Sequence, residues 1–378
     1  MMKAANRLDT VQEYYFSKKL REVRALSTEG KPIINMGIGS PDLQPPAKVI
    51  KAIQQAVVIE GAHKYQSYQG LPEFREAVSD FYKNKYNVEV SSDHEILPLM
   101  GSKEGILHIS MAFLNKGDKV LIPNPGYPTY TSVTNLVEAN PIFYELTSEN
   151  NWEPDFEKLE KEDVSDIKMM WVNYPHMPTG AKATQALFEK LIAFGKKHQI
   201  LIINDNPYSF ILNNNPLSIL SVKGAKETAL ELNSLSKSFN MAGWRVGMLL
   251  GASSFLKEVL KVKTQMDSGM FYGIQQGAIS ALKVSSSWFS EMNEVYKNRR
   301  KLVWKIADTL GCSYDKNTTG MFVWAKTPEG VKAENMVDDL LYNKDIFIAP
   351  GFIFGSSGEG YIRFSLCVPE EKIKEALE

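Results

Sequence analysis

Between Pro46 and about Gly251, helical stretches alternate with short apolar runs. Five of these runs are predicted to be strands, at residues 95–100, 119–123, 169–173, 201–205 and 229–234. This alternation is typical of an α/β domain with a mostly parallel sheet. Because ligands bind at the carboxyl ends of the strands in such a sheet, the polar residues that follow each run are candidates for a site.

The two flanks of this region have different patterns. Residues 7–26 predict an amphipathic arm, because a loose helical stripe runs among their charges and consists of Leu8, Val11, Tyr15, Leu20, Val23 and Leu26. Residues 272–310 predict one or two long helices, broken or bent near 285–287. After them we expect short strands at 321–324, 346–348 and 361–365 and then a terminal helix. This later part is predicted to form a smaller α+β domain.

The chain has 378 residues, which is too long for one small domain. We expect an N-terminal arm with part of the small domain at 1–45, a large domain at 46–275, and an interdomain helix with the C-terminal small domain at 276–378. A net charge of -1 gives no electrostatic reason to expect nucleic acid or an acidic membrane surface as a partner. The expected partner is therefore a small molecule.

Cysteine usage and hydropathy predict a reducing, cytoplasmic compartment. Cys312 and Cys367 are the only cysteines and are far apart, so neither a disulfide framework nor a zinc site is predicted. We expect no metal site. No apolar run approaches the roughly 20 residues that a membrane span needs.

The stretch from Ser234 to Gly247 has the composition of a phosphate site. Ser234 and Ser236 would point to one face of an extended strand, and the Arg245 guanidinium can donate two hydrogen bonds to phosphate oxygens. An amine buried beside other positive charge becomes a nucleophile toward carbonyls, which indicates Schiff-base chemistry at Lys237. The alternative is that Lys237 and Arg245 are ordinary surface cations in a serine-rich loop.

Three other segments place polar groups at the predicted strand ends. Gly101, Ser102 and Lys103 open a helix after the strand that ends at Met100, so the free N–H groups of that helix form an anion site. Asp205 ends the run 201–205. In residues 37–42, glycine lets the backbone approach a ligand closely. We reject a dinucleotide-binding fingerprint there because no helix follows directly.

Together these motifs resemble the pyridoxal-phosphate-dependent aminotransferases of class I and II, over nearly the whole chain. The resemblance implies the α/β architecture of fold type I, shared with aspartate aminotransferase, in which the large domain binds pyridoxal 5'-phosphate. It also implies a ping-pong reaction in which an amino group passes from an L-amino acid to the cofactor and then to a 2-oxo acid.

The resemblance also implies a role for each matched residue. Lys237 corresponds to the lysine that forms the Schiff base and moves the substrate proton, Asp205 to the carboxylate at the pyridine nitrogen, Tyr208 to the phenol at the ring oxygen, and Tyr127 to the stacked aromatic ring. The phosphate binders correspond to Gly101, Ser102, Lys103, Ser234, Ser236 and Arg245. Arg363 and the Gly39 backbone correspond to the groups that bind the substrate α-carboxylate. Tyr65 corresponds to a tyrosine that reaches the neighbouring subunit's cofactor phosphate, which implies a homodimer with shared active sites.

Several alternatives stay open at this level. Asp205 could be a turn aspartate, Tyr127 a core aromatic residue, and Arg363 a solvent-facing strand arginine. The same scaffold supports C–S lyases and other eliminations, and it also occurs as a ligand-sensing module in transcriptional regulators. Against the sensing module, we expect no room for a helix-turn-helix domain before Ile33. A structural protein with a vestigial cofactor site is a further alternative.

The substrate side chain is not identified by the motifs. One subgroup of the family binds a distal carboxylate with an arginine from the partner subunit, and the corresponding residues 263–272 contain no arginine. A dicarboxylate substrate stays open, because Lys103 or the N-terminal arm could bind the second carboxylate.

One position departs from the family pattern. The family has Asn-Pro-Thr-Gly where this chain has Met177-Pro178-Thr179-Gly180, so a methionine stands where an asparagine donates to the cofactor ring oxygen. Methionine has no donor. His176 and Asn173 are the candidates to replace it.

Replacing Met177 with asparagine is expected to lower the pKa at which the cofactor-bound Lys237 loses its proton. The ring oxygen is most negative in the deprotonated form, so a restored donor stabilises that form. A spectroscopic pH titration of both proteins measures the two pKa values. Equal values, or a higher value for Met177→Asn, would contradict the prediction.

Overall fold

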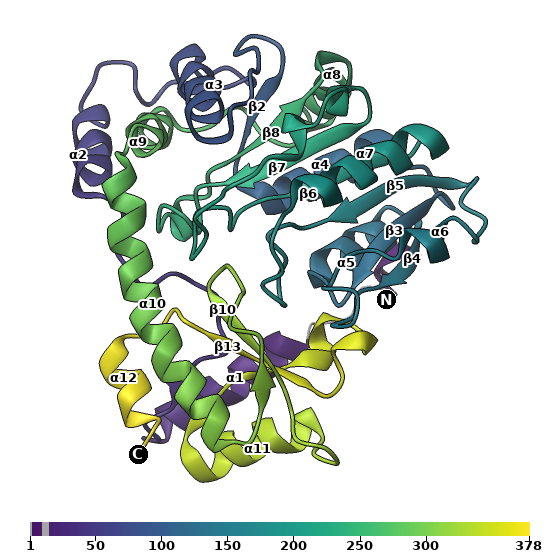
Figure 1. The fold of residues 1–378 in the computed structure, drawn as a ribbon. Coiled ribbons are helices and arrows are strands. Elements are labelled where there is room, and N and C mark those ends of the chain that lie inside the picture. Colours follow the sequence, from purple (N-terminus) through teal and green to yellow (C-terminus); the bar gives the residue numbers. More distant parts are fainter. Residues whose placement is uncertain (1, 10–14) are drawn as a thin grey trace.

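The computed structural model describes residues 2–9 and 15–378. Figure 1 shows two bodies, one built around a large sheet and one around a small sheet, with the long helix α10 (Ser286–Thr309) running from one to the other. Part of the predicted amphipathic arm is helical, as the short 3-10 helix η1 (Asn6–Leu8) and helix α1 (Tyr15–Thr28). Val11, which belongs to the predicted apolar stripe, lies outside the described residues.

The large sheet has seven strands in the order β2-β8-β7-β6-β5-β3-β4. Their bounds are β2 Ile96–Leu99, β3 Lys119–Asn124, β4 Asn140–Glu145, β5 Ile167–Val172, β6 Leu201–Asp205, β7 Ala229–Ser234 and β8 Gly247–Gly251. β8 is antiparallel to β2 and β7, and the other pairs are parallel. The prediction of a mostly parallel sheet is confirmed. β4 and β8 were not predicted: β4 is a partly exposed edge strand, and β8 has glycine at both ends.

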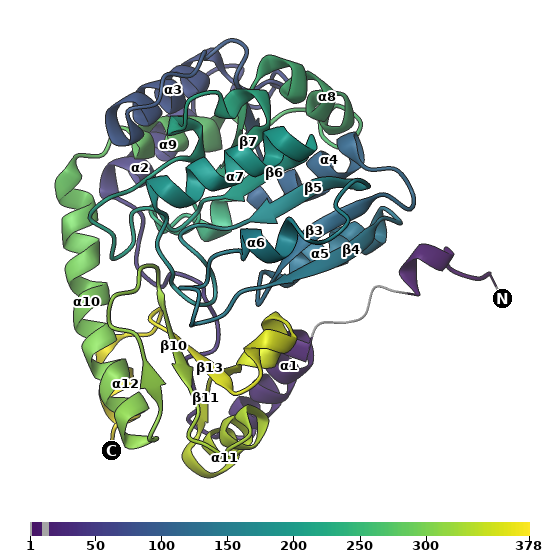
Figure 2. The same ribbon diagram turned by 45° about the vertical axis from the view of Figure 1, so that its right-hand side comes forward.

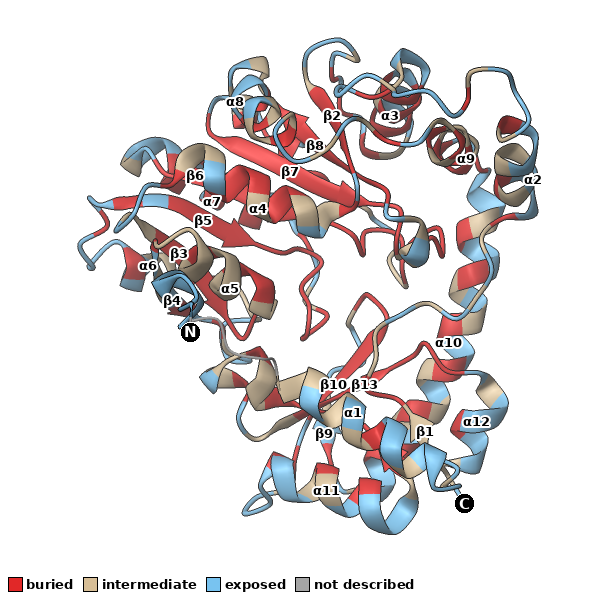
Figure 3. Cartoon of the chain, turned by 180° about the vertical axis from the view of Figure 1, so that it is seen from behind, coloured by how far each residue is buried: buried red, intermediate tan, exposed pale blue. Residues whose placement is uncertain are grey.

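Side chains of the central strands alternate between two apolar clusters on opposite faces of this sheet. In β5, Met169 and Trp171 belong to one cluster, and Met170 and Val172 belong to the other. Such alternation follows from the two-residue period of a strand, and a sheet buried on both faces needs helices on both. These helices are α2 Ala47–Ala56, α3 Pro72–Tyr86, α4 Ser102–Phe113, α5 Pro128–Leu136, α6 Phe156–Leu159, α7 Gln185–His198, α8 Ser253–Lys263 and α9 Tyr272–Leu282. Figure 3 shows the buried strands between helices whose outer faces are exposed.

The second body contains a four-stranded antiparallel sheet in the order β12-β13-β10-β9. Its strands are β9 Ser313–Tyr314, β10 Phe322–Lys326, β12 Ala349–Pro350 and β13 Tyr361–Ser365; β1 Ile34–Asn35 pairs separately with β11 Ile346–Phe347, and the helices are α11 Ala333–Lys344 and α12 Glu370–Glu375. The predicted break near 285–287 is confirmed, since α9 ends at Leu282 and α10 begins at Ser286. The domain limits at 45/46 and 275/276 stay a prediction.

An ion pair connects α10 to the loop that carries Gly39. Arg299 donates from Nη1 and Nη2 to the two Asp42 carboxylate oxygens at 2.7 and 2.8 Å, and Nη1 also donates to the Leu366 carbonyl at 3.0 Å. A guanidinium with two parallel bonds to one carboxylate fixes orientation as well as distance. In residues 2–9 and 15–378, no helix is long and apolar enough to cross a membrane.

Candidate functional site

A cavity of about 650 Å³ lies where the strand ends of the large sheet meet the small sheet. Most of the predicted site residues line it, namely Gly39, Ser102, Lys103, Tyr127, Asp205, Tyr208, Ser234, Ser236, Lys237, Arg245 and Arg363. Gly101 and Tyr65 are not among the described lining residues. Gly101 nevertheless adjoins the cavity as the N-cap of α4, whereas Tyr65 is 89% exposed on the surface.

The cavity lining includes groups of the kind that can bind a phosphate. The N-terminus of α4 opens at Ser102, the buried Ser234 and Ser236 follow the end of β7, and Arg245 follows the 3-10 helix η4 (Ala242–Trp244). Gly101 has φ +90°, and a Cβ at this position would collide with the Arg245 guanidinium. Only glycine therefore lets the guanidinium lie against the start of the helix, where free N–H groups attract an anion.

Lys237 is partly buried, and its amine donates to the Gly39 carbonyl at 2.6 Å. Burial lowers the pKa of this amine, and the positive charges of Arg363 and Arg245 lower it further, against the opposing effects of Cys367 and Asp205. A larger fraction of the amine is therefore uncharged near neutral pH than for an exposed lysine. The shift is in the direction that favours the uncharged amine, which is the form that a nucleophile or a general base needs.

Asp205 presents one bonded and one free carboxylate oxygen. Oδ2 accepts a hydrogen bond from the Tyr130 hydroxyl at 2.9 Å, and Oδ1 is buried with no partner among the described residues. Burial raises the pKa of this carboxyl to about 7, although the Tyr130 bond opposes the increase. A buried polar atom without a partner is rare and indicates a missing ligand, so Oδ1 is suited to bind a protonated ring nitrogen.

Tyr130 was not predicted as a site residue. Tyr130 is fully buried. Its ring stacks on Trp171, with a distance of 4.9 Å between the ring centroids and an angle of 7° between the ring planes, and it meets the Tyr127 ring edge-on at a centroid distance of 5.6 Å. The sequence places Tyr130 three residues after Tyr127, but Tyr127 is the N-cap of α5 and lies outside the helix, so this spacing alone does not indicate the contact with Asp205.

Arg363 lies in β13 with its guanidinium between two aromatic rings. The distances from Cζ to the ring centroids are 4.0 Å for Phe322 and 4.5 Å for Phe354. Nη2 donates to the Gly37 carbonyl at 2.8 Å, while Nε has no partner among the described residues. Burial lowers the pKa of Arg363 to about 10, which leaves it charged at neutral pH. The arginine is buried, so its alternative as a solvent-facing strand residue is wrong.

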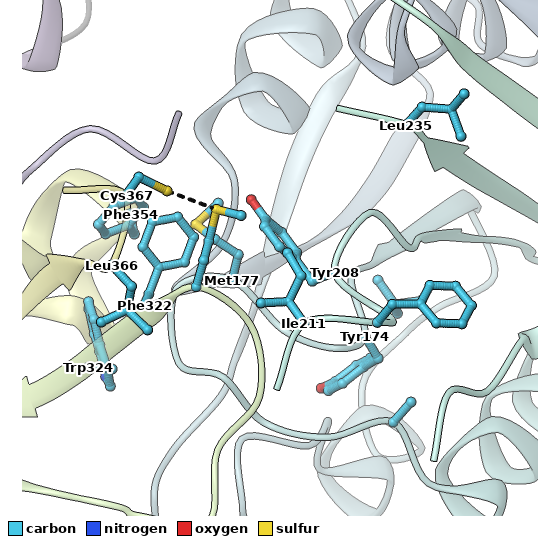
Figure 4. Close-up of a cluster of buried hydrophobic side chains, with 14 of the residues drawn as sticks. Tyr174, Met177, Tyr208, Ile211, Leu235, Phe322, Trp324, Phe354, Leu366 and Cys367 are labelled. Atoms are coloured by element: carbon cyan, nitrogen blue, oxygen red, sulfur yellow. Dashed lines mark hydrogen bonds between the residues drawn. The ribbon is translucent and has the colours of Figure 1, made fainter. Parts of the chain in front are cut away.

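Met177 contacts this arginine, with Sδ 3.3 Å from Arg363 Nη1. Figure 4 shows Met177 with Phe322, Phe354 and Tyr208 in one buried cluster. Of the two expected replacement donors, only Asn173 lines the cavity, and its Nδ2 already donates to the Asp205 carbonyl at 2.5 Å. His176 lies outside the lining, and its Nδ1 meets Thr179 Oγ1 at 2.8 Å.

The body with the small sheet supplies a wall that sequence reasoning missed. It comprises Tyr15, Phe16 and Ser17 of α1, Phe322 of β10, and Ile353 and Phe354 of the 3-10 helix η5 (Gly351–Phe354). Gly39 is packed against this wall, because a Cβ there would collide with the Phe322 ring. These residues come from three distant parts of the chain, and no single motif joins them.

These groups fit pyridoxal phosphate. The cavity combines an anion site, an amine of lowered pKa that can bind an aldehyde, and an unpartnered carboxylate oxygen for a ring nitrogen. Tyr127 and Tyr208 line the same space. Each feature of the cofactor thus has a complementary group on this chain.

Comparison with known proteins supports the same conclusion. The family model "Aminotransferase class I and II" matches residues 31–378. The LL-diaminopimelate aminotransferase of Halothermothrix orenii is 39% identical over 379 residues, covering 100% of this chain and 97% of that protein. The enzyme of the same name from Aquifex aeolicus is 37% identical over 380 residues, with 100% and 98% covered. The solved structure of apo-BacF from Bacillus subtilis has a TM-score of 0.96 at 33% identity and covers 100% of this chain and 97% of that chain.

These similarities confirm the expected fold type I architecture and amino-group transfer, and they give no support to the lyase alternative. The chain therefore belongs to the aminotransferase class I and II family of pyridoxal-phosphate-dependent enzymes.

Proposed function

We propose that Lys237, Asp205 and Arg363 each have a distinct role in the transfer of an amino group from an L-amino acid to a 2-oxo acid. The observation that carries the proposal is the single cavity in which three groups meet. These are a partly buried amine of lowered pKa, a buried carboxylate oxygen without a partner among the described residues, and a charged guanidinium held between two rings.

The cofactor would be held at three points. Its phosphate would be bound by the start of α4 at Gly101, with Ser102, Lys103, Ser234, Ser236 and Arg245; its ring by Tyr127, Asp205 and Tyr208; and its aldehyde by Lys237. When bound, pyridoxal phosphate supplies an electron-withdrawing ring that stabilises the charge left by the departing α-proton.

The remaining steps belong to side chains of this chain. Arg363 would orient the substrate by binding its α-carboxylate with two N–H groups, and the family pattern assigns the Gly39 backbone to the same carboxylate. The Lys237 amine would accept the α-proton and would then deliver it to the carbon of the cofactor's former aldehyde group, and its lowered pKa favours the uncharged form that can accept a proton. Asp205 in its charged form would keep the ring nitrogen of the bound cofactor protonated.

We also propose a homodimer with shared active sites. Tyr65 is 89% exposed, yet the family pattern assigns it to a cofactor phosphate. An exposed tyrosine with such a role fits a subunit interface, where tyrosine is enriched. A cytoplasmic location is also proposed, and the two free, buried cysteines agree with it. Recovery of the protein from a periplasmic or membrane fraction would contradict that location.

The cofactor-loaded protein, mixed with single amino acids and no 2-oxo acid, is expected to release at most one 2-oxo acid per site while its visible absorption band is lost. The panel should include phenylalanine, glutamate, aspartate and LL-diaminopimelate. Lys237→Ala should slow the reaction at least about 10³-fold, because proton transfer is lost. Repeated release of pyruvate with ammonia would instead identify a lyase, and no spectral change with any amino acid would refute the proposal.

Tyr130→Phe is expected to weaken pyridoxal phosphate binding about 10-fold, because a buried charged carboxylate loses a hydrogen bond worth about 1.5 kcal/mol. Fluorescence titration of the cofactor-free protein measures the Kd. Tyr144→Phe is the matched control, since the Tyr144 hydroxyl is also buried but donates to the Trp171 carbonyl at 2.7 Å. An unchanged Kd for Tyr130→Phe, or equal weakening in both variants, would show that Tyr130 does not position Asp205.

Mixing the Lys237→Ala and Tyr65→Ala proteins after joint unfolding and refolding is expected to restore activity. A mixed dimer with shared sites has one site with both defects and one with neither, so recovery should approach about a quarter of the unmodified activity. Activity assays before and after mixing measure it. If the mixture is only as active as the average of the two variants, the sites are not shared.

A further inference from the structure

The cavity wall on the side of the small sheet is apolar and largely aromatic. Tyr15, Phe16, Phe322, Ile353 and Phe354 form it, on the same side of the cavity as Arg363. Figure 2 shows α1 beside the segment between β12 and β13, which contains Ile353 and Phe354. A substrate whose carboxylate lies at Arg363 would therefore direct its side chain along aromatic surface.

Packing within the small body fixes this wall in place. Three ring pairs hold the wall, and their distances are between ring centroids. The Tyr15 ring meets Phe352 edge-on at 5.2 Å, the Phe16 ring lies 5.8 Å from the fully buried Phe347, and the Phe354 ring lies 6.0 Å from Trp324. Rings held by other rings have little freedom to move aside, so the wall is a preformed surface. Preformed apolar surface favours a ligand that can cover it with apolar area.

Each charged group among the described residues that line the cavity already has a role in the proposed function. Among the described lining residues, Asp205 is the sole carboxylate, and the cations are Lys103, Lys237, Arg245 and Arg363. The proposed function assigns all five to the cofactor or to the α-carboxylate. LL-diaminopimelate carries a distal ammonium and a distal carboxylate, and an ammonium buried without an acidic partner is costly.

We propose that the preferred amino donor of this enzyme is an aromatic amino acid with an uncharged side chain, which packs against Tyr15, Phe16, Ile353 and Phe354. This assignment rests on the proposed function of the same cavity. Tyr15 and Phe16 line the cavity side by side, so an aromatic side chain of the substrate can cover apolar area of both residues.

The test compares kcat/KM for L-phenylalanine, L-tyrosine, L-leucine, L-glutamate and LL-diaminopimelate in the half-reaction of the cofactor-loaded protein. We expect both aromatic amino acids to exceed LL-diaminopimelate and glutamate by about 100-fold. A faster reaction with diaminopimelate, glutamate or leucine overturns the aromatic assignment and leaves amino-group transfer intact. The absence of reaction with every amino acid overturns the proposed function as well, so the two failures are distinguishable.

Variants of the wall residues test whether the wall binds the substrate side chain, and a second variant guards against a failure of the first to fold. Phe16→Ala is expected to lower kcat/KM for phenylalanine about 10-fold, because buried aromatic surface is lost, while the Kd of pyridoxal phosphate stays unchanged. Ile353→Ala should also lower kcat/KM for phenylalanine, and it replaces Phe16→Ala in the test if that variant does not fold. Lys18→Ala, at an exposed position of α1, is the matched control and should change neither quantity. If both wall variants keep the unmodified preference for phenylalanine, the wall does not bind the side chain.

Discussion

The site depends on burying the Lys237 amine close to two guanidinium groups. Each unit by which the pKa falls corresponds to about 1.4 kcal/mol of preference for the uncharged amine, and the fold has to supply that free energy. It does so with a sheet buried on both faces, which holds Lys237 after β7, and with Arg363 on a strand of the other body. Asp205 opposes the two positive charges from the end of the adjacent strand β6.

The framework of this arrangement could be predicted from the sequence. The strands 201–205, 229–234 and 361–365 have the same limits in the structure, because each is a short run of buried residues that ends at polar or turn residues. β4 and β8 were missed for a physical reason. A strand at the sheet edge is only partly buried, and glycine at both ends of β8 is equally typical of a turn.

The position of a residue in the cavity was predictable where a single motif marks the end of a strand, as at Lys237 and Asp205. It was not predictable where the chain brings distant segments together. The bond from Tyr130 to Asp205 joins α5 to β6, and the contact from Arg363 to Met177 joins β13 to the loop after β5. Neither contact has a local pattern, since each arises from the order of strands in space. The same is true of the apolar wall, whose residues come from α1, β10 and η5.

The small body holds Arg363 and the large body holds Lys237, and α10 runs between the two bodies (Figure 1). In the proposed roles, the small body therefore binds the α-carboxylate of the substrate through Arg363, and the large body holds Lys237 at the reacting amino group. With these roles, the distance between the two groups would select for length, because it would suit a compound whose carboxylate and amino group sit on the same carbon. Simple amines, which lack the carboxylate, and β-amino acids, which carry it one carbon too far away, would not meet that requirement.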